Sequence, residues 1–279
     1  MIDVLIATYR PDPAMLKAQT DSIRAQKGVT VNIIRREDDS GAGACANFAA
    51  MLGESRADYV AFSDQDDVWR PDKLTKCFAR LKALEARYGR ETPLLVFCDG
   101  LVTDDKMKPH SGTVISRQRV DVRNGISFNR LLMQNFIAGN AMLFNAALRE
   151  KAGRIPAGAL MHDNWLALVA AAFGHIGFVD EPLYLYRQHR SNALGATTAG
   201  CGHFLRRAIE GPMAFRWRLQ ANVVQARAFV ERFGAESPVS VIALAGLDEK
   251  KFFARRTELV RHRLYKHGFL RNLSLFAFA

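Results

Sequence analysis

The sequence contains little cysteine: four residues among 279, at positions 45, 77, 98 and 201. They are far apart in the chain, form no CxxC pair and have no histidine at metal-ligand spacing. This pattern excludes a zinc finger type of site and a disulfide framework. We therefore expect four small, buried thiols.

Long hydrophobic runs are also missing. The longest apolar stretches, such as Val239 to Leu247, have about half of the roughly 20 residues that a membrane-spanning helix needs. The amino terminus lacks a basic region, a long apolar region and a small-residue cleavage site. We expect a cytoplasmic protein without a transmembrane segment.

Charge is unevenly distributed along the chain. Residues 200–279 hold fourteen Lys and Arg residues against six Asp and Glu residues, which is +8 of the net charge of +11. A basic segment indicates an anionic partner, and a membrane surface, a nucleic acid or an acidic glycan would each satisfy it.

Short apolar stretches alternate with helical patterns over the first hundred residues. The expected strands are 4–8, 29–34, 59–62 and 94–98, and the expected helices are 14–26, 47–52 and 74–88. This alternation predicts an α/β fold, a mostly parallel sheet with helices on both faces. Between 135 and 192 we expect short strands and one compact helix at 163–173, and beyond 200 basic helices.

Acidic clusters follow three of the expected strands, at 37–39, 64–67 and 99–105. Ligands of open α/β sheets bind at this edge. Asp64, Asp66 and Asp67 place three carboxylates within four positions, where repulsion is costly unless a cation relieves it. Mg²⁺ or Mn²⁺ suits such oxygen ligands together with substrate phosphates. The alternative is a solvated acidic loop in which Asp67 caps the following helix.

The surrounding segment, Phe62 to Leu74, has the sequence FSDQDDVWRPDKL. It resembles the family 2 glycosyltransferases of GT-A fold, in particular the bacterial branch with rhamnosyltransferases of surface-polysaccharide assembly. The resemblance continues in order through residues 131–145, 161–168 and 180–189. It implies a GT-A (Rossmann-like) transferase domain over 1–199, followed by a helical basic extension over 200–279.

The resemblance also implies roles for individual residues. Asp64 and Asp66 form the DxD pair, with Asp66 the direct metal ligand, and Asp67 shapes the sugar site. Asp163 matches the catalytic base, which takes the proton of the acceptor hydroxyl. Residues at family positions near the nucleotide, diphosphate or metal are Thr8, Arg10, Arg187 and His189. Residues in segments around the sugar and acceptor are Trp69, Gly139, Asn140, His162 and Asn164.

Several of these residues also have an ordinary structural interpretation. Asp163 would serve as a helix N-cap, Arg187 and His189 would belong to a surface loop, and Thr8 and Arg10 would lie in a plain strand-to-loop transition.

The nucleoside site departs from the family pattern. Asp38 and Asp39 stand where an Asp-Asp-Gly-Ser type motif is expected, but Asp38 lies only 26 residues before Asp64. The segment 41–48, GAGACANF, already resembles the later NxGxxxNF segment. One βα unit is therefore missing or merged, and either Asp38 or Asp39 contacts the nucleoside.

Two other functions are consistent with parts of the sequence. Gly41, Gly43 and Ala46 follow a strand with the spacing of a dinucleotide fingerprint, which would indicate an NAD-dependent enzyme. A catalytically impaired module that binds membrane glycan through the basic extension is the non-enzymatic alternative. The acidic trio and Asp163 argue against both.

The function we predict is that of a metal-dependent, inverting glycosyltransferase with Mn²⁺ or Mg²⁺ as cofactor. The expected donor is a nucleotide-diphospho-sugar such as dTDP-rhamnose, and the expected acceptor a lipid-linked saccharide of cell-surface polysaccharide biosynthesis. We expect peripheral attachment to the anionic inner face of the cell membrane, and no nucleic acid partner.

Overall fold

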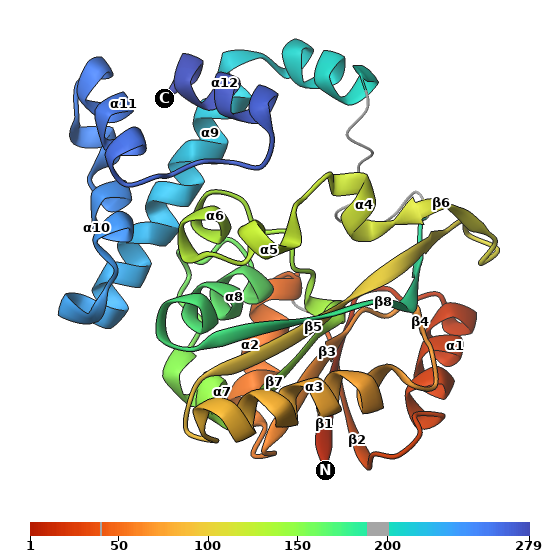
Figure 1. Ribbon diagram of the computed structural model, residues 1–279. Coiled ribbons are helices and arrows are strands. Elements are labelled where there is room, and N and C mark those ends of the chain that lie inside the picture. Colours follow the sequence, from red (N-terminus) through yellow and green to blue (C-terminus); the bar gives the residue numbers. More distant parts are fainter. Residues whose placement is uncertain (40, 189–200) are drawn as a thin grey trace.

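The computed structural model describes residues 1–39, 41–188 and 201–279 (Figure 1). Strands and helices alternate in the first hundred residues, as the apolar pattern predicts. The elements are β1 (Ile2–Thr8), α1 (Pro13–Arg24), β2 (Val31–Glu37), α2 (Ala44–Glu54), β3 (Tyr59–Ser63), β4 (Val68–Trp69), α3 (Lys73–Tyr88) and β5 (Leu94–Thr103).

Shorter elements follow, and then the basic helices. They are β6 (Pro109–Thr113), α4 (Val114–Gln118), α5 (Val122–Gly125), α6 (Phe128–Met133), the 3-10 turn η1 (Gly139–Ala141), β7 (Met142–Asn145), α7 (Ala146–Ala152), α8 (His162–Phe173), β8 (His175–Arg187), α9 (Cys201–Phe233), η2 (Gly234–Glu236), α10 (Val239–Ala245), η3 (Leu247–Glu249), α11 (Phe252–Arg261) and α12 (Phe269–Phe278). The helix expected at 163–173 is α8.

The strands of the described residues form one eight-stranded sheet in the order β2-β1-β3-β7-β5-β8-β4, with β6 paired to β5. The longest ladders, β1 with β2, β1 with β3 and β5 with β8, are parallel. Strand β7 is antiparallel to both of its neighbours. This arrangement confirms the predicted α/β fold. Among the described residues α2 is the one regular element between β2 and β3, and β2 lies at one edge of the sheet.

Strand β3 shows how the two helical layers cover the sheet. Because side chains of a strand point alternately to its two faces, Tyr59 packs edge-on against Phe78 of α3, with ring centroids 4.9 Å apart. On the opposite face Phe62 packs against Phe48 of α2 at 5.0 Å. The acidic loop follows directly after this fully buried strand.

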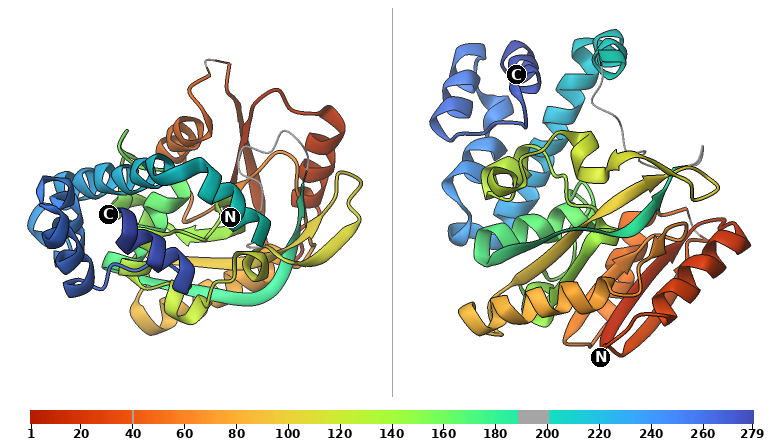
Figure 2. Two further views of the ribbon diagram at one scale, coloured as in Figure 1. Left: turned by 90° about the horizontal axis from the view of Figure 1, so that it is seen from above. Right: turned by 45° about the vertical axis from the view of Figure 1, so that its right-hand side comes forward.

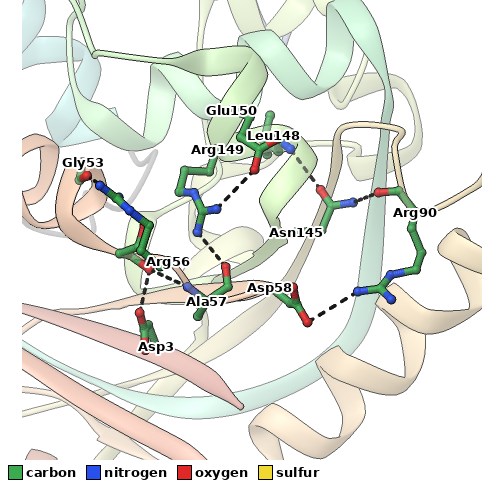
Figure 3. A network of polar contacts seen from close by, with 11 residues as sticks. Asp3, Gly53, Arg56, Ala57, Asp58, Arg90, Asn145, Leu148, Arg149 and Glu150 are labelled. Carbon is green, nitrogen blue, oxygen red and sulfur yellow. Dashed lines mark hydrogen bonds and ion pairs between the residues drawn. The ribbon is translucent and has the colours of Figure 1, made fainter.

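A polar network fixes the start of β3, at the end of the sheet opposite to the acidic loop (Figure 3). The hydroxyl of Ser55 donates to the carboxylate of Asp3 at 2.6 Å, and Arg149 donates to the carbonyl oxygen of Ala57 at 2.6 Å. Arg90 and Asp58 form an ion pair at 3.5 Å. These contacts hold the segment that leads into β3 against β1 and α7.

Helices α9 to α12 lie together at one end of the molecule, away from the amino terminus (Figures 1 and 2). Phe229 of α9 is fully buried and contacts Trp165 of α8, with ring centroids 5.5 Å apart. The side-chain amide of Asn222 donates to the carbonyl oxygen of Met133 at 3.2 Å. The extension is thus packed against the sheet-bearing part of the chain by an aromatic and polar interface.

In the described part of the chain no helix combines the length and the apolar character needed to cross a bilayer. Cys45, Cys77 and Cys98 are free thiols, the last two of them buried.

Candidate active site

The acidic loop, Asp64 to Asp67, leaves the carboxyl end of β3 and is tied to the end of β1 by Gln65. The side-chain oxygen of Gln65 accepts the N–H of Tyr9 at 2.9 Å, and its amide nitrogen donates to the carbonyl oxygen of Tyr9 at 3.2 Å. A side chain that pairs with both backbone groups of one residue fixes the spacing between the two strand ends.

Asp67 and Arg187 connect the same loop to β8. The carboxylate of Asp67, 1% exposed, accepts the backbone N–H of Arg187 at 3.2 Å and a hydrogen bond from the side-chain amide of Asn140. The guanidinium of Arg187 donates to the carbonyl oxygen of Asp66 at 2.8 Å and to that of Asp105 at 2.7 Å. Arg187 therefore supports the backbone of the acidic loop.

Asp163 lies in the first turn of α8 and faces the same region. One of its carboxylate oxygens accepts the N–H of Gly139 at 3.1 Å, and the other accepts the N–H of Asn164 at 2.6 Å. The charge of Asp163 raises the pKa of Asp64, so these two carboxylates lie within electrostatic reach of each other. The fold thus brings together the acidic loop and the predicted base, which are about 100 residues apart in sequence.

Burial and mutual repulsion shift the acidic side chains toward their protonated forms. Burial, with the charges of Asp66 and Asp163 added, raises the pKa of Asp64 to about 7. Burial raises the pKa of Asp163 to about 6, against the effect of the two backbone N–H groups that it accepts. A base with a pKa just below neutral pH is well matched to proton transfer from a hydroxyl. Burial raises the pKa of Asp67 well above its ordinary value as well.

Lys73 is a buried cation beneath the acidic loop, and the sequence analysis assigned it no role. Its ammonium group donates to the carbonyl oxygen of Asn140 at 2.5 Å and lies 3.3 Å from the ring centroid of Trp69. Burial lowers the pKa of Lys73 to about 8, and the charges of nearby acidic groups oppose this shift. Lys73 stands inside the quoted FSDQDDVWRPDKL segment, but no sequence rule predicts that a lysine there is 1% exposed.

His162 forms the wall behind Asp163. Its ring stacks on Phe48 at 4.1 Å and meets Phe62 edge-on at 4.8 Å. Burial lowers the pKa of His162 to about 3, so the imidazole is neutral at physiological pH. Gly139 passes close to this ring, because a Cβ atom at Gly139 would lie 2.8 Å from Nε2 of His162. The close approach requires glycine at this position.

The residues predicted around the sugar and acceptor are mostly covered. Trp69, Asn140, His162 and Asn164 are 2%, 1%, 4% and 7% exposed. Asn140 binds Asp67, and the side-chain oxygen of Asn164 accepts a hydrogen bond from Gln225 of α9 at 3.3 Å. These side chains therefore support the acidic loop and Asp163 from behind in this structure. Their contact with a sugar stays a prediction.

The residues predicted at the nucleotide lie along the ends of β1 and β2. The hydroxyl of Thr8 is covered and donates to the carbonyl oxygen of Arg36 at 3.3 Å. Arg10 is exposed and has a left-handed backbone, with φ of 42°. The carboxylate of Asp38 accepts the N–H groups of Ala42 and Gly43 at 3.1 and 2.7 Å.

Asp39 is exposed on the same loop. Asp38 therefore orders the loop that leads into α2, and Asp39 presents its carboxylate to solvent. His189, the third predicted metal ligand, lies outside the described residues.

The donor set fits a hard divalent cation that is shared with substrate. Asp64 and Asp66 are half-buried carboxylates at one strand end, where burial and then the charge of Asp66 raise the pKa of Asp64. The described residues contain no group of three or more His, Cys, Asp and Glu side chains able to hold a metal by themselves. Two carboxylates completed by phosphates and water are the usual arrangement for Mg²⁺.

Comparisons with known proteins agree with this geometry. Residues 5–89, which contain β1 to α3 and the acidic loop, match the family described as Glycosyl transferase family 2. Uncharacterised proteins of Mycobacterium tuberculosis and Mycobacterium bovis are 29% identical over 152 residues, which is 53% of this chain and 39% of theirs. The chain thus aligns with about two fifths of the length of these curated relatives.

Solved structures share the fold at low sequence identity. Staphylococcus aureus TarS 1–349 in complex with UDP-GlcNAc has a TM-score of 0.52 and 12% identity, covering 94% of this chain and 88% of that one. The mannosyltransferase PcManGT of Pyrobaculum calidifontis, in complex with GDP-Man and Mn²⁺, has a TM-score of 0.52 and 16% identity, and the match covers 99% of this chain and 78% of that one. The fold is that of the GT-A glycosyltransferases, and the match over residues 5–89 supports a glycosyltransferase.

Proposed function

We propose that this chain is a metal-dependent, inverting glycosyltransferase that moves a sugar from a nucleotide-diphospho-sugar to a saccharide acceptor. The observation that supports it most is that Asp163, in the first turn of α8, faces Asp64 and Asp66 at the end of β3 and is held there by the N–H of Gly139. The match to Glycosyl transferase family 2 covers the acidic loop.

In the proposed mechanism the chain separates donor binding from proton transfer. Asp64 and Asp66 hold the cation, Mn²⁺ or Mg²⁺, which when bound neutralises charge on the leaving diphosphate. Asp163 accepts the proton of the acceptor hydroxyl as its oxygen attacks the anomeric carbon from the opposite face. A single displacement of this kind inverts the configuration. Arg187 holds the backbone of Asp66 during this step.

The finer assignments are part of the proposal. We propose dTDP-rhamnose as the first donor to test, because the FSDQDDVWRPDKL segment resembles rhamnosyltransferases. A lipid-linked saccharide of surface-polysaccharide biosynthesis is the proposed acceptor, at the inner face of the cell membrane. The basic extension supports this location, since it carries most of the net charge.

The experiment is a calorimetric titration of UDP, GDP and dTDP into the protein, with Mn²⁺ and with a chelator. We expect one diphosphate to bind only with Mn²⁺, and Asp66→Ala to abolish this binding with an unchanged circular dichroism spectrum. The matched control is Glu91→Ala, which removes an exposed carboxylate from the turn between α3 and β5. Metal-dependent binding that survives in Asp66→Ala contradicts the assigned metal ligand, and its absence for all three diphosphates contradicts the proposed function.

A further inference from the structure

Helix α12 presents its apolar residues to solvent. Phe269, Leu270, Leu273 and Phe278 are 79%, 50%, 57% and 40% exposed. With 3.6 residues per turn these four positions fall within one half of the helix circumference, and the fully buried Leu275 lies on the other half. A helix that packs on the protein core by Leu275, Phe276 and Ala279 and still exposes four large apolar side chains needs a second apolar environment.

The beginning of α11 continues this surface. Phe252 and Phe253 are 57% and 80% exposed. Arg256 joins them to the end of α12, because its guanidinium lies 3.4 Å from the ring centroid of Phe252 and donates to the carbonyl oxygens of Ala277 and Ala279 at 3.1 and 2.8 Å. The beginning of α11 and the end of α12 are therefore neighbours (Figure 2). We call the aromatic surface the set Phe252, Phe253, Phe269, Leu270, Leu273 and Phe278.

The charges around the aromatic surface are almost all positive. Residues 250–279 contain eight Lys and Arg residues and one acidic residue, Glu258. Lys251, Arg261 and Arg263 are exposed. Glu258 is paired with Lys250 at 3.6 Å and lies 3.2 Å from His262. A second copy of this chain would bring a surface of the same sign against it, whereas an anionic lipid surface complements both the charge and the aromatic side chains.

We propose that the aromatic surface of α11 and α12 inserts into the interface of an anionic lipid bilayer while the flanking Lys and Arg residues bind the headgroups. Strand β1 runs from the amino terminus toward the end of the molecule where α9 to α12 lie (Figure 1). Strand β3 is parallel to β1, so the acidic loop follows β3 at the end of the sheet that is nearer to these helices. This inference deepens the proposed function, and its connection to a lipid-linked acceptor rests on that function.

The test is co-sedimentation of the full chain with vesicles of phosphatidylcholine, with and without phosphatidylglycerol, at low and high salt. We expect binding to need phosphatidylglycerol and to weaken with salt. The triple variant Phe253→Ser, Phe269→Ser and Leu273→Ser should bind at least about tenfold more weakly, because burial of each large side chain alone is worth about that factor. The matched control is Val239→Ser with Ile242→Ser, which removes exposed apolar side chains of α10 outside the aromatic surface.

A second variant tests the electrostatic half of the proposal. Lys251→Glu with Arg261→Glu leaves the aromatic surface intact and should reduce binding to phosphatidylglycerol vesicles at low salt, with a smaller difference at high salt. This variant keeps the test decisive if the triple variant does not fold.

Three results would overturn the lipid assignment. The first is that the wild-type protein stays in the supernatant, and the second is that the variants sediment like the wild type. The third is that light scattering shows a wild-type dimer and a monomer of the triple variant. Mn²⁺-dependent diphosphate binding, measured on the same samples, reports separately on the proposed function, so failure of one is distinguishable from failure of the other.

Discussion

Replacing Gly139 by alanine tests whether the turn at η1 positions Asp163. The added Cβ would lie 2.8 Å from Nε2 of His162 and 3.5 Å from Cβ of Asp163. The imidazole must retreat by about 0.6 Å to reach ordinary van der Waals distance, but it is 4% exposed and its ring stacks on Phe48.

Overpacking of this kind costs about 1–3 kcal/mol. For a chain of this size that cost corresponds to a fall in melting temperature of about 2–12 °C. The N–H of Gly139 also donates to Asp163 at 3.1 Å and helps to keep its pKa down. A displaced turn weakens this hydrogen bond, so the pH at which activity rises should move upward as well.

The assay combines thermal unfolding with a pH profile of sugar transfer or donor hydrolysis. Gly53→Ala is the matched control, because its Cβ would meet nothing within 4 Å on the exposed side of α2, and alanine in a helix stabilises by about 0.5–1 kcal/mol. His162→Ala should relieve the clash, so the double variant should lose less stability than the sum of the two single ones. A melting temperature and pH profile of Gly139→Ala equal to those of wild type would refute the reasoning.

Three further predictions concern Asp163, the pH dependence of stability, and Arg187. Asp163→Asn should keep Mn²⁺-dependent diphosphate binding but lower transfer by about 10²- to 10⁴-fold, and near-normal transfer by this variant would exclude the base role. Transfer by the wild type should rise with pH through about 6, where Asp163 loses its proton. Since the folded-state pKa values of Asp64 and Asp163 exceed the ordinary 3.8, the metal-free protein should lose stability as pH rises from about 4 to about 7. Mn²⁺ should raise the melting temperature more at pH 8 than at pH 5, and an equal effect at both would contradict this. Arg187→Ala should weaken diphosphate binding about tenfold or more, because it removes a charged hydrogen bond to the backbone of Asp66; unchanged affinity in calorimetry would show that the loop is held without it.

The order of strands and helices could be predicted from the sequence because each buried strand is a short apolar run closed by polar residues. Strands β1 and β3 and helices α1, α3 and α8 lie within about three residues of their expected bounds. The antiparallel insertion of β7 between β3 and β5 was not predicted. Periodicity reports which residues are buried, but strand order depends on contacts between distant segments.

The acidic residues of the site could be predicted, but not the side chains that hold them. Asp64 and Asp66 stand out because they belong to three carboxylates within four positions after a buried strand, and Asp163 because its segment continues the family resemblance. Lys73, which lies in a helix pattern like many surface lysines, is buried only because Trp69 and the turn at Asn140 close over it. Lys73 and Asn140 are 67 positions apart, so their contact cannot be predicted from a local sequence pattern.

Asp64 and Asp67 are neighbouring aspartates that differ in the number of hydrogen bonds they accept. Asp67, fully covered, keeps its place because Asn140 of η1 and Arg187 of β8 both donate to it. In the described part of the chain Asp64 accepts no comparable set of donors, and burial beside Asp66 raises its pKa to about 7. A buried carboxylate near neutral pH is poised to exchange a proton for a cation, since a bound divalent ion favours the charged form that burial disfavours. The difference in donors between two neighbouring aspartates therefore separates their roles: Asp67 stabilises the loop, and Asp64 remains available for the metal of the proposed function.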